Sequence, residues 1–291
     1  MADYHVEAEI DAQPSCWRRA AERLPDVREA LPRDGERVAV FGCGTSLYMA
    51  KAYAALREAR GLGVTDAFAA SEPPFGREYD RHVAITRSGT TTEVLRAIER
   101  LPETAATTAI TAVPDAPIPA GTRTVVLEFA DERSVVQTRF ATSALALLRA
   151  SLGDPVPDAD ATRALGEPLA PEWLAAGQIT FLGRGWTVGL ADEAALKARE
   201  AAQLWTESYP AMEYRHGPIS IAQPGRLTWM FGPAPDGLAE EVAASGAAFA
   251  ASDLDPMAHL IVAERLADAH ARARGLDPDH PRSLTRSVVL P

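Results

Sequence analysis

The sequence has few cysteines and no long apolar run, and both absences exclude classes of protein. Its 291 residues contain two cysteines, Cys16 and Cys43, which are too few for a disulfide scaffold and lack the spacing of a metal site. No run of eighteen uncharged apolar residues occurs, and the start at Met1-Ala2-Asp3-Tyr4-His5 is acidic, unlike a signal peptide. We therefore expect a cytoplasmic protein with no membrane span, no metal and no cofactor.

Positive charge is also in short supply. Lys and Arg total 29 against 40 Asp and Glu, which gives a formal charge of −11. Nucleic-acid binding needs a basic face, so we expect no nucleic-acid partner. Apolar residues make up 47% of the chain, which is enough for a substantial core and too much for a disordered protein. The length allows one large domain or two modest ones.

Two hydroxyl-rich segments, Gly42–Ser46 and Thr86–Thr92, each follow an apolar run and precede an apolar-periodic stretch. Both are typical of strand–turn–helix junctions, where free amide groups and the helix dipole favour an anion. Neither contains the Gly-Lys-Ser/Thr of a P-loop or a full Gly-x-Gly-x-x-Gly motif. The pattern indicates a compact phosphate monoester, such as a sugar phosphate, rather than ATP or NAD. The hydroxyl donors would be Thr45, Ser46, Thr86, Ser88 and Thr91.

The first half of the chain alternates strand-like and helix-like segments. Strands are expected at 37–41, 64–69, 82–86, 106–111 and 123–128, and helices at 15–30, 45–60, 90–101 and 135–152. This alternation predicts an α/β fold with a parallel sheet covered on both faces. In such sheets ligands bind beyond the carboxyl ends of the strands, where both hydroxyl-rich segments fall.

The second half repeats this arrangement after a proline-rich stretch at 153–172, which predicts a connector. A strand at 178–182, a Gly-Arg-Gly turn and a helix at 188–206 follow. Further strands are expected at 227–231 and 247–251, then a helix at 257–274 and a proline-kinked tail that ends in a short apolar strand. We interpret the chain as a duplicated fold with a first domain at 1–155, a linker at 156–171 and a shortened second domain at 172–291.

Three ionisable residues share one face of the helix expected after the Gly-Arg-Gly turn. Glu193, Lys197 and Glu200 are spaced i, i+4 and i+7. The same spacing fits an ordinary surface salt bridge, which by itself is roughly twice as common an explanation. The Gly-rich start of the helix, its many alanines, and Trp205 and Tyr209 beyond it favour a functional role.

His216 precedes Gly217-Pro218 and is expected in a loop among polar neighbours, where functional residues concentrate. A histidine of near-neutral pKa and a carboxylate are the usual groups for moving protons on a sugar. His259 and His270 fall within a helical pattern, where we expect them to be solvated or packed. No His and Cys pair has the spacing of metal ligands.

Seven segments follow one another in an order that is specific as a set. They are Glu9-Ile10 with Gln13-Pro14, Cys43-Gly44-Thr45-Ser46, Ser88-Gly89 with Thr91, Glu193-Ala194-Ala195-Leu196-Lys197 with Glu200, Tyr209-Pro210-Ala211, His216-Gly217-Pro218, and Asp279-His280-Pro281-Arg282-Ser283-Leu284. Together they resemble the sugar isomerase (SIS) domain family over nearly the whole chain. The resemblance is greatest to the isomerase half of glucosamine–fructose-6-phosphate aminotransferase and to its free-standing deglycase and amino-sugar isomerase relatives.

The resemblance implies two tandem SIS domains, each a doubly wound parallel sheet flanked by helices in the flavodoxin or Rossmann manner. It implies that Glu200 is the base that shuttles a proton between C1 and C2, with Lys197 and Glu193 on the same face. In the family the histidine equivalent to His216 comes from the neighbouring subunit and helps to open the sugar ring. The resemblance therefore implies a homodimer. The implied phosphate-binding residues are Gly44, Thr45, Ser46, Thr86, Ser88 and Thr91.

The sequence departs from the family pattern near the sugar. Arg286 stands where the aminotransferase has the lysine that forms an imine, and arginine cannot act as an amine nucleophile, although it can bind an anion. Arg87 replaces a usual glutamine, and Gln137-Thr138-Arg139 replaces Ser-Thr-Lys. We count Arg87, Gln137 and Arg286 as candidate substrate-binding residues. The sequence contains no glutaminase domain, so glutamine-dependent synthesis is not expected of this polypeptide alone. The 238–256 region looks shortened.

These features favour an enzyme that acts on an amino-sugar 6-phosphate, such as glucosamine 6-phosphate or N-acetylglucosamine 6-phosphate, through its open-chain carbonyl. Glu200 or Glu193 would remove the proton next to the carbonyl, and Lys197 or Arg286 would stabilise the oxyanion. Isomerisation, deamination and dehydration of the intermediate, the last a lyase reaction, stay open. The alternatives are a fructosamine 6-phosphate deglycase and a non-catalytic phosphosugar sensor. We see no basic helix-turn-helix segment, which favours catalysis over sensing.

Overall fold

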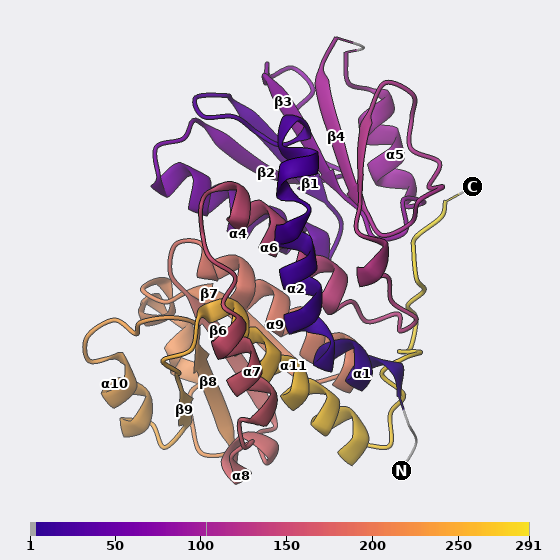
Figure 1. The fold of residues 1–291 in the computed structure, drawn as a ribbon. Coiled ribbons are helices and arrows are strands. Elements are labelled where there is room, and N and C mark those ends of the chain that lie inside the picture. The colour runs from indigo at the N-terminus through magenta and orange to yellow at the C-terminus, as the bar shows by residue number, and fades with distance from the viewer. Residues whose placement is uncertain (1–3, 103, 291) are drawn as a thin grey trace. The chain divides into compact units, whose positions relative to one another are not determined.

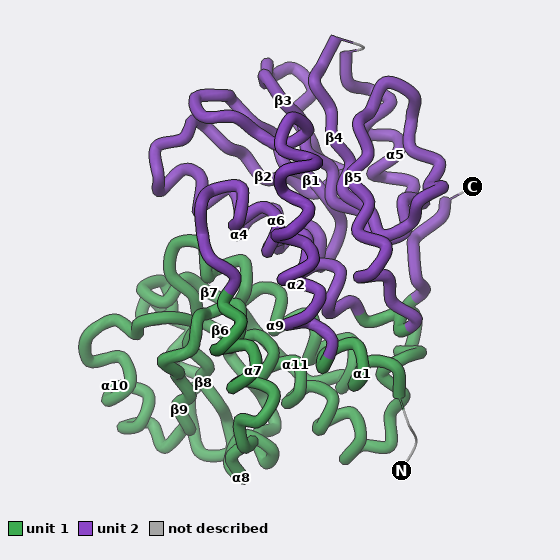
Figure 2. The backbone as a smooth tube through the Cα atoms, in the orientation of Figure 1, with its two compact units in different colours: residues 1–11, 134–136, 157–284 green, residues 12–133, 137–156, 285–291 purple. Residues whose placement is uncertain are grey.

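The computed structural model describes residues 4–102 and 104–290. Packing divides the chain into two compact units, shown in green and purple in Figure 2. Unit 1 comprises residues 1–11, 134–136 and 157–284, and unit 2 comprises residues 12–133, 137–156 and 285–291. Each unit contains a parallel sheet of its own.

Unit 2 is built on a five-stranded sheet in the order β2-β1-β3-β4-β5 (Figure 1). The strands are β1 (Val38–Gly42), β2 (Thr65–Ala69), β3 (Arg81–Ile85), β4 (Ala106–Thr111) and β5 (Arg123–Val126). All neighbouring strands are parallel, and β1 and β3 are buried along their whole length, as expected of strands covered on both faces. The five strands coincide with those expected from the sequence to within two residues at either end.

The helices of unit 2 flank this sheet. They are α2 (Gln13–Glu22), α3 (Leu24–Val27), η1 (Arg28–Ala30), α4 (Thr45–Ala59), α5 (Thr92–Glu99), η2 (Glu128–Ala130) and α6 (Arg139–Ser151). α6 packs against α2 and α4. The helix expected at 15–30 is divided into three pieces, because Pro25 starts the new helix α3 and cannot continue α2.

Unit 1 is built on a four-stranded parallel sheet in the order β7-β6-β8-β9. Its strands are β6 (Gln178–Gly183), β7 (Trp205–Pro210), β8 (Arg226–Met230) and β9 (Ala248–Ala250). Its helices are α1 (His5–Asp11), α7 (Asp158–Gly166), α8 (Pro171–Leu174), α9 (Thr187–Ala202), η3 (Glu213–His216), η4 (Pro218–Ile221), α10 (Leu238–Ala244) and α11 (Pro256–Ala273). α11 packs against α9, α7 and α1.

Two elements differ from the sequence expectation. The helix expected to reach residue 206 ends at Ala202, because Gln203 adopts the left-handed conformation (φ 51°) that terminates helices. The following residues form β7, which pairs with β6. The expected apolar strand in the tail is also wrong for the described residues, since 284–290 form no ladder. Instead, the Thr92 amide donates a single hydrogen bond to the Val288 carbonyl (3.1 Å).

The expected domain boundaries differ from those that packing gives. The expected linker at 156–171 contains α7, whose Ala161 and Ala164 are buried where the helix packs against α11. The N-terminal helix α1 belongs to unit 1, where the Asp279 carboxylate accepts hydrogen bonds from the His5 and Val6 amides (2.7 and 2.9 Å). Both units are therefore discontinuous in sequence, which no local change in composition indicates.

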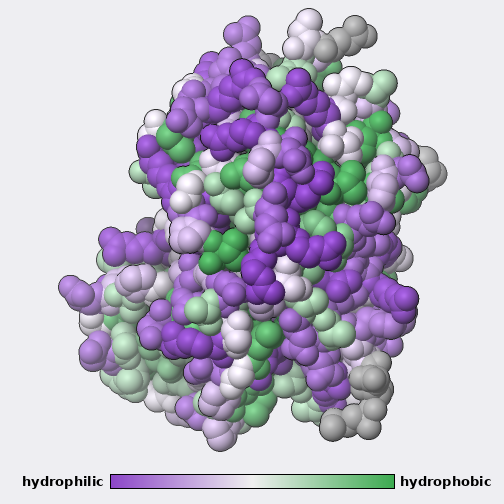
Figure 3. All heavy atoms as spheres, viewed as in Figure 1, coloured by the Kyte–Doolittle hydropathy of each residue, from purple (hydrophilic) through white to green (hydrophobic). Residues whose placement is uncertain are grey.

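Apolar side chains are dispersed among hydrophilic ones on the face of the molecule shown in Figure 3. Within the described ranges, no helix combines the length and the apolar character needed to cross a membrane.

His259 is buried in α11, with 2% of its surface exposed. Its ring stacks on Trp229, with centroids 4.6 Å apart and an interplanar angle of 23°. Burial lowers the pKa of His259 to about 3, so the ring is neutral in the folded protein. The expectation that this residue lies in a helix is confirmed, and it is packed rather than solvated.

We predict that His259 makes folding stability fall as the pH is lowered. The unfolded state binds the proton below pH ~6.5, whereas the folded state resists it down to about pH 3. Between pH 7.5 and 5.0 the wild type should lose on the order of 2 kcal/mol more of its free energy of unfolding than His259→Phe does. Urea unfolding followed by circular dichroism measures this difference. Equal losses in both proteins would contradict the burial of a neutral ring.

Candidate active site

The two hydroxyl-rich segments lie at neighbouring strand ends of unit 2. β1 and β3 are adjacent in the sheet, while β2 lies on the far side of β1 and β4 on the far side of β3, so the strand order reverses between β1 and β3 (Figure 1). Ligands of open parallel sheets bind beyond the carboxyl ends of the strands at such a point. The first segment leads into α4 and the second leads into α5.

Two glycines allow the close packing at this edge of the sheet. A Cβ atom on Gly42 would lie 2.7 Å from Ser46 Cβ and 2.9 Å from the Ile85 carbonyl oxygen, so a side chain would force α4 away from β3. Gly89 has a positive φ of 65°, and a Cβ atom there would lie 2.3 Å from Ala116 Cβ. Both positions therefore need glycine.

Most of the expected phosphate-binding hydroxyls are buried. Their exposed fractions are 4% for Thr45, 2% for Ser46, 3% for Thr86 and 7% for Ser88. Thr86 Oγ1 has no hydrogen-bond partner among the described residues, which is costly for a buried polar atom. Ser88 Oγ accepts hydrogen bonds from the amide and the hydroxyl of Thr90 (3.2 and 3.0 Å). Thr86 is thus suited to donate to an anion, whereas Ser88 already orders its own loop.

The helix N-termini at this edge are not equivalent. Gly44 caps α4 without a side chain, and Thr91 caps α5 without a side-chain hydrogen bond. At α5, however, the Thr92 amide is bonded to the Val288 carbonyl of the tail. The positive end of the α4 dipole is therefore the better place for an anion.

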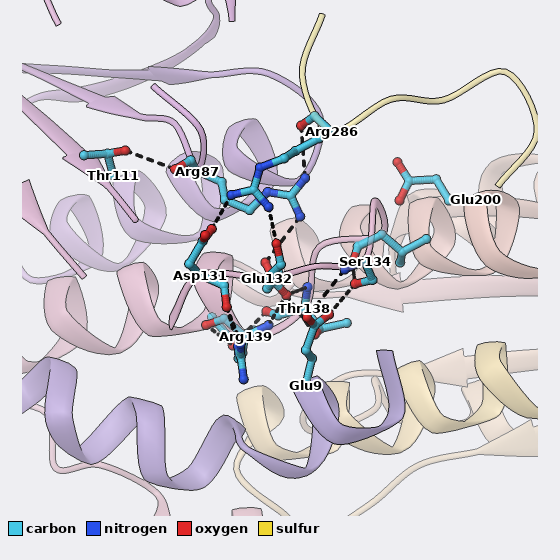
Figure 4. A network of polar contacts seen from close by, with 12 residues as sticks. Glu9, Arg87, Thr111, Asp131, Glu132, Ser134, Thr138, Arg139, Glu200 and Arg286 are labelled. Atoms are coloured by element: carbon cyan, nitrogen blue, oxygen red, sulfur yellow. Dashed lines mark hydrogen bonds and ion pairs between the residues drawn. The ribbon is translucent and has the colours of Figure 1, made fainter. Parts of the chain in front are cut away.

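Two of the candidate substrate-binding residues have protein partners of their own (Figure 4). Arg87 is 2% exposed, donates to the Arg286 carbonyl (3.0 Å) and lies 3.6 Å from Glu132 through its Nη1. Arg286 donates to the Asp131 carboxylate and to the Glu132 carbonyl. Gln137 Oε1 is buried without a hydrogen-bond partner in the described part of the chain. Contact of these three residues with a substrate stays a prediction.

Glu132 organises this network, although the sequence pattern did not single it out. Its Oε1 accepts hydrogen bonds from the Thr138 amide (2.6 Å), the Thr138 hydroxyl (3.0 Å) and the Arg139 amide (2.8 Å), which satisfies the N-terminus of α6. Its Oε2 is the atom that faces Arg87. The Arg87 carbonyl accepts a hydrogen bond from Thr111 Oγ1 (3.0 Å), so the second hydroxyl-rich segment is fixed from both sides.

In unit 1, α9 presents its three ionisable residues as one connected group. Lys197 Nζ lies 2.5 Å from Glu200 Oε2 and 3.5 Å from Glu193 Oε1. Lys197 and Glu193 are each 1% exposed, whereas the Glu200 side chain is 19% exposed. The group is therefore an internal one rather than the surface salt bridge that its spacing also fits. Glu200 is the member that a substrate can reach.

Glu264 on α11 also acts on Lys197, and it was not found from the sequence. Burial alone would lower the pKa of Lys197, but Glu193, Glu200 and Glu264 together outweigh burial and raise it. Lys197 is therefore an ammonium at neutral pH. Glu264 is 3% exposed, so a carboxylate on the apolar face of a helix was the available signal.

Across residues 4–102 and 104–290, no three His, Cys, Asp or Glu side chains are grouped to hold a metal ion.

His216 is exposed and forms the last residue of η3, so it lies in a short 3-10 helix rather than in the expected loop. The next residue, Gly217, has a positive φ of 136°. The contribution of His216 to the site of a partner subunit stays a prediction.

Comparison with known proteins adds to this geometry. The isomerizing glutamine–fructose-6-phosphate aminotransferase of Sulfurisphaera tokodaii is 28% identical, over 89% of this chain and 51% of that relative. Its counterpart from Xanthomonas campestris pv. campestris is 27% identical, over 98% of this chain and 56% of that relative. A crystal structure of glucosamine-6-phosphate deaminase from Thermotoga maritima matches with a TM-score of 0.81 and 24% identity, over 98% of this chain and 100% of that chain. These matches agree with the resemblance to the SIS (sugar isomerase) domain family, to whose proteins the chain is similar over nearly its whole length.

The chain spans about half the length of the curated relatives that it matches over most of its own length. No family model matches it. The structural likeness confirms the expected α/β class with parallel sheets. The sequence relatives and the solved structures together confirm the resemblance inferred from the seven segments.

We predict that Lys197→Met destabilises the protein by about 3–5 kcal/mol, because it leaves buried carboxylates without their cation. Adding Glu264→Gln to Lys197→Met should recover part of the loss by removing one of these charges. Urea unfolding of the single and double variants measures both effects. A Lys197→Met variant as stable as the wild type would show that the buried ion group does not form.

Proposed function

We propose that this protein is a homodimeric phosphosugar isomerase or deaminase that acts on an amino-sugar 6-phosphate. We also propose that each of its two sheets is the core of one SIS domain. The observation that carries the proposal is the Lys197–Glu200 pair, in which a partly exposed carboxylate is held 2.5 Å from a buried ammonium. The relatives named above support the substrate class, since one acts on fructose 6-phosphate and another is named for glucosamine 6-phosphate.

The phosphate group of the substrate is bound at the switch point of unit 2. The N-terminus of α4 supplies the positive end of its dipole, and Thr45, Ser46 and Thr86 supply hydroxyl donors. Arg87, held by Glu132, keeps the second hydroxyl-rich segment in place. These groups orient the sugar and do not themselves react.

Glu200 transfers the proton on the open-chain sugar. It takes the proton from the carbon next to the carbonyl, the C–H electron pair forms the C=C bond of an enediol or enolamine, and the carbonyl oxygen takes up the negative charge or a proton. Glu200 then returns the proton to the neighbouring carbon. Lys197 donates a hydrogen bond to Glu200 and so fixes the orientation of this side chain, and the positive charge of Lys197 stabilises the developing anion.

A covalent imine plays no part in this proposal. The sequence contains only two lysines, Lys51 and Lys197. Lys197 is held as an ammonium, which has no free electron pair to attack a carbonyl. Lys51 lies over the Tyr48 ring of α4, at 5.2 Å from the centroid. The arginine at position 286 cannot replace the missing amine.

We predict turnover of at least one of three substrates: glucosamine 6-phosphate, N-acetylglucosamine 6-phosphate and fructose 6-phosphate. Product masses and released ammonia distinguish isomerisation, deamination and dehydration. Glu200→Gln should lower kcat about 100-fold or more, whereas Glu240→Gln on the exposed face of α10 should leave it unchanged. Binding of these compounds without any turnover would favour the phosphosugar sensor instead.

The proposed role of His216 predicts that activity is shared between subunits. His216→Ala and Glu200→Gln homodimers should each be inactive, because each lacks one group in both sites. Each mixed dimer contains one complete site and one that lacks both groups, so heterodimers formed by refolding the two variants together should have about half of the wild-type rate. The readout is activity of heterodimers purified with two different tags. Heterodimers as inactive as the parents would refute the shared site.

A further inference from the structure

Unit 2 contains a hollow that the proposed function does not use. It is a cavity of about 650 Å³. Its lining includes Arg37, Asp80 and Ala105, which directly precede β1, β3 and β4. It therefore opens at the amino ends of the strands, whereas the hydroxyl-rich segments follow their carboxyl ends.

The cavity lies where the connection between β2 and β3 lacks a helix. β1 is followed by α4 and β3 by α5, but residues 70–80 between β2 and β3 form only turns and irregular chain. α5 packs on the sheet face that carries Phe41 and Ala84. Ala39 and His82 are paired neighbours, and by strand alternation they lie on this same face. Beside α5 the face is covered by the irregular connection, and the space beneath it stays open.

Aromatic side chains form part of the cavity wall. Phe68 and Tyr79 meet edge to face with centroids 6.3 Å apart, and Tyr79 meets His82 in the same way at 5.7 Å. Phe41 and Phe75 complete the ring surfaces of the lining. A volume of a few hundred Å³, apolar and aromatic walls and a few polar groups are the properties of small-molecule sites.

His82 is the polar group inside this aromatic lining. It is 6% exposed, and its Nδ1 is buried without a hydrogen-bond partner in the described ranges. Burial lowers the pKa of His82, so the ring is neutral near pH 7. A neutral imidazole offers one donor and one acceptor, and leaving a buried one unsatisfied costs free energy.

We propose that this cavity binds a neutral, flat aromatic or heteroaromatic molecule that exchanges a hydrogen bond with His82. The ring surfaces select a planar apolar body, and His82 selects a polar atom on it. The ligand is proposed to be neutral because the two positive charges of the lining, Arg37 and Arg77, balance the two negative ones, Glu78 and Asp80. The site is independent of the proposed sugar chemistry, because none of these residues has a role in it.

The test uses N-phenyl-1-naphthylamine, a neutral aromatic amine with one N–H group whose fluorescence rises in apolar sites. The wild type should bind it in a saturable manner at micromolar concentration. Ala105→Phe, which fills the mouth of the cavity, should abolish binding. His82→Leu keeps an apolar side chain of similar size but removes the nitrogens, and it should weaken binding about tenfold.

Trp205→Ala is the matched control. Trp205 is the most exposed large apolar side chain, at 74%, and lines a concave surface of unit 1, so it is the competing place for an aromatic probe. The proposal predicts unchanged binding in this variant, with circular dichroism confirming the fold of all three. Failure of the wild type to bind, unchanged binding in Ala105→Phe or in His82→Leu, or loss of binding in Trp205→Ala would each overturn it.

Discussion

Lys197 brings a positive charge into the interior of unit 1, where carboxylates from α9 and α11 converge on it. Removing an ammonium from water is expensive, and the carboxylates must lie close to compensate for it. The packing of α9 against α11 and against β6 follows from this requirement. Gly183 allows α9 to start next to its strand, since a Cβ atom there would lie 2.3 Å from the Thr187 carbonyl oxygen. Alanines along α9 then permit the close approach of α11.

Unit 2 also contains a buried cation paired with a carboxylate, but this pair has a different structural role. Arg87 follows β3 directly, and its partner Glu132 is bound in turn by the first amides of α6. This pair positions the backbone of a hydroxyl-rich segment, whereas the pair in unit 1 positions a carboxylate. In both cases the buried charge fixes a polar group before any ligand is bound, which is the preorganisation that catalysis requires.

The sequence predicted the features that depend on local pattern. The five strands of unit 2 are short segments rich in apolar and β-branched residues, and the shared face of Glu193, Lys197 and Glu200 follows from helical spacing. Features that depend on distant contacts were missed. β7 was hidden because only two residues, Gln203 in the left-handed conformation and Leu204, separate it from the end of α9. Glu132 and Glu264 gain their roles from residues on other elements, and Arg286 pairs with Asp131, which lies 155 positions away.

The central claim is that Glu200 moves a proton at the carbon next to the sugar carbonyl. Incubation of the protein with glucosamine 6-phosphate or fructose 6-phosphate in D₂O, followed by proton NMR and mass measurement, tests it directly. The account predicts deuterium at C1 or C2 of the recovered sugar with the wild type and none with Glu200→Gln. Undiminished exchange or undiminished turnover by Glu200→Gln would contradict it.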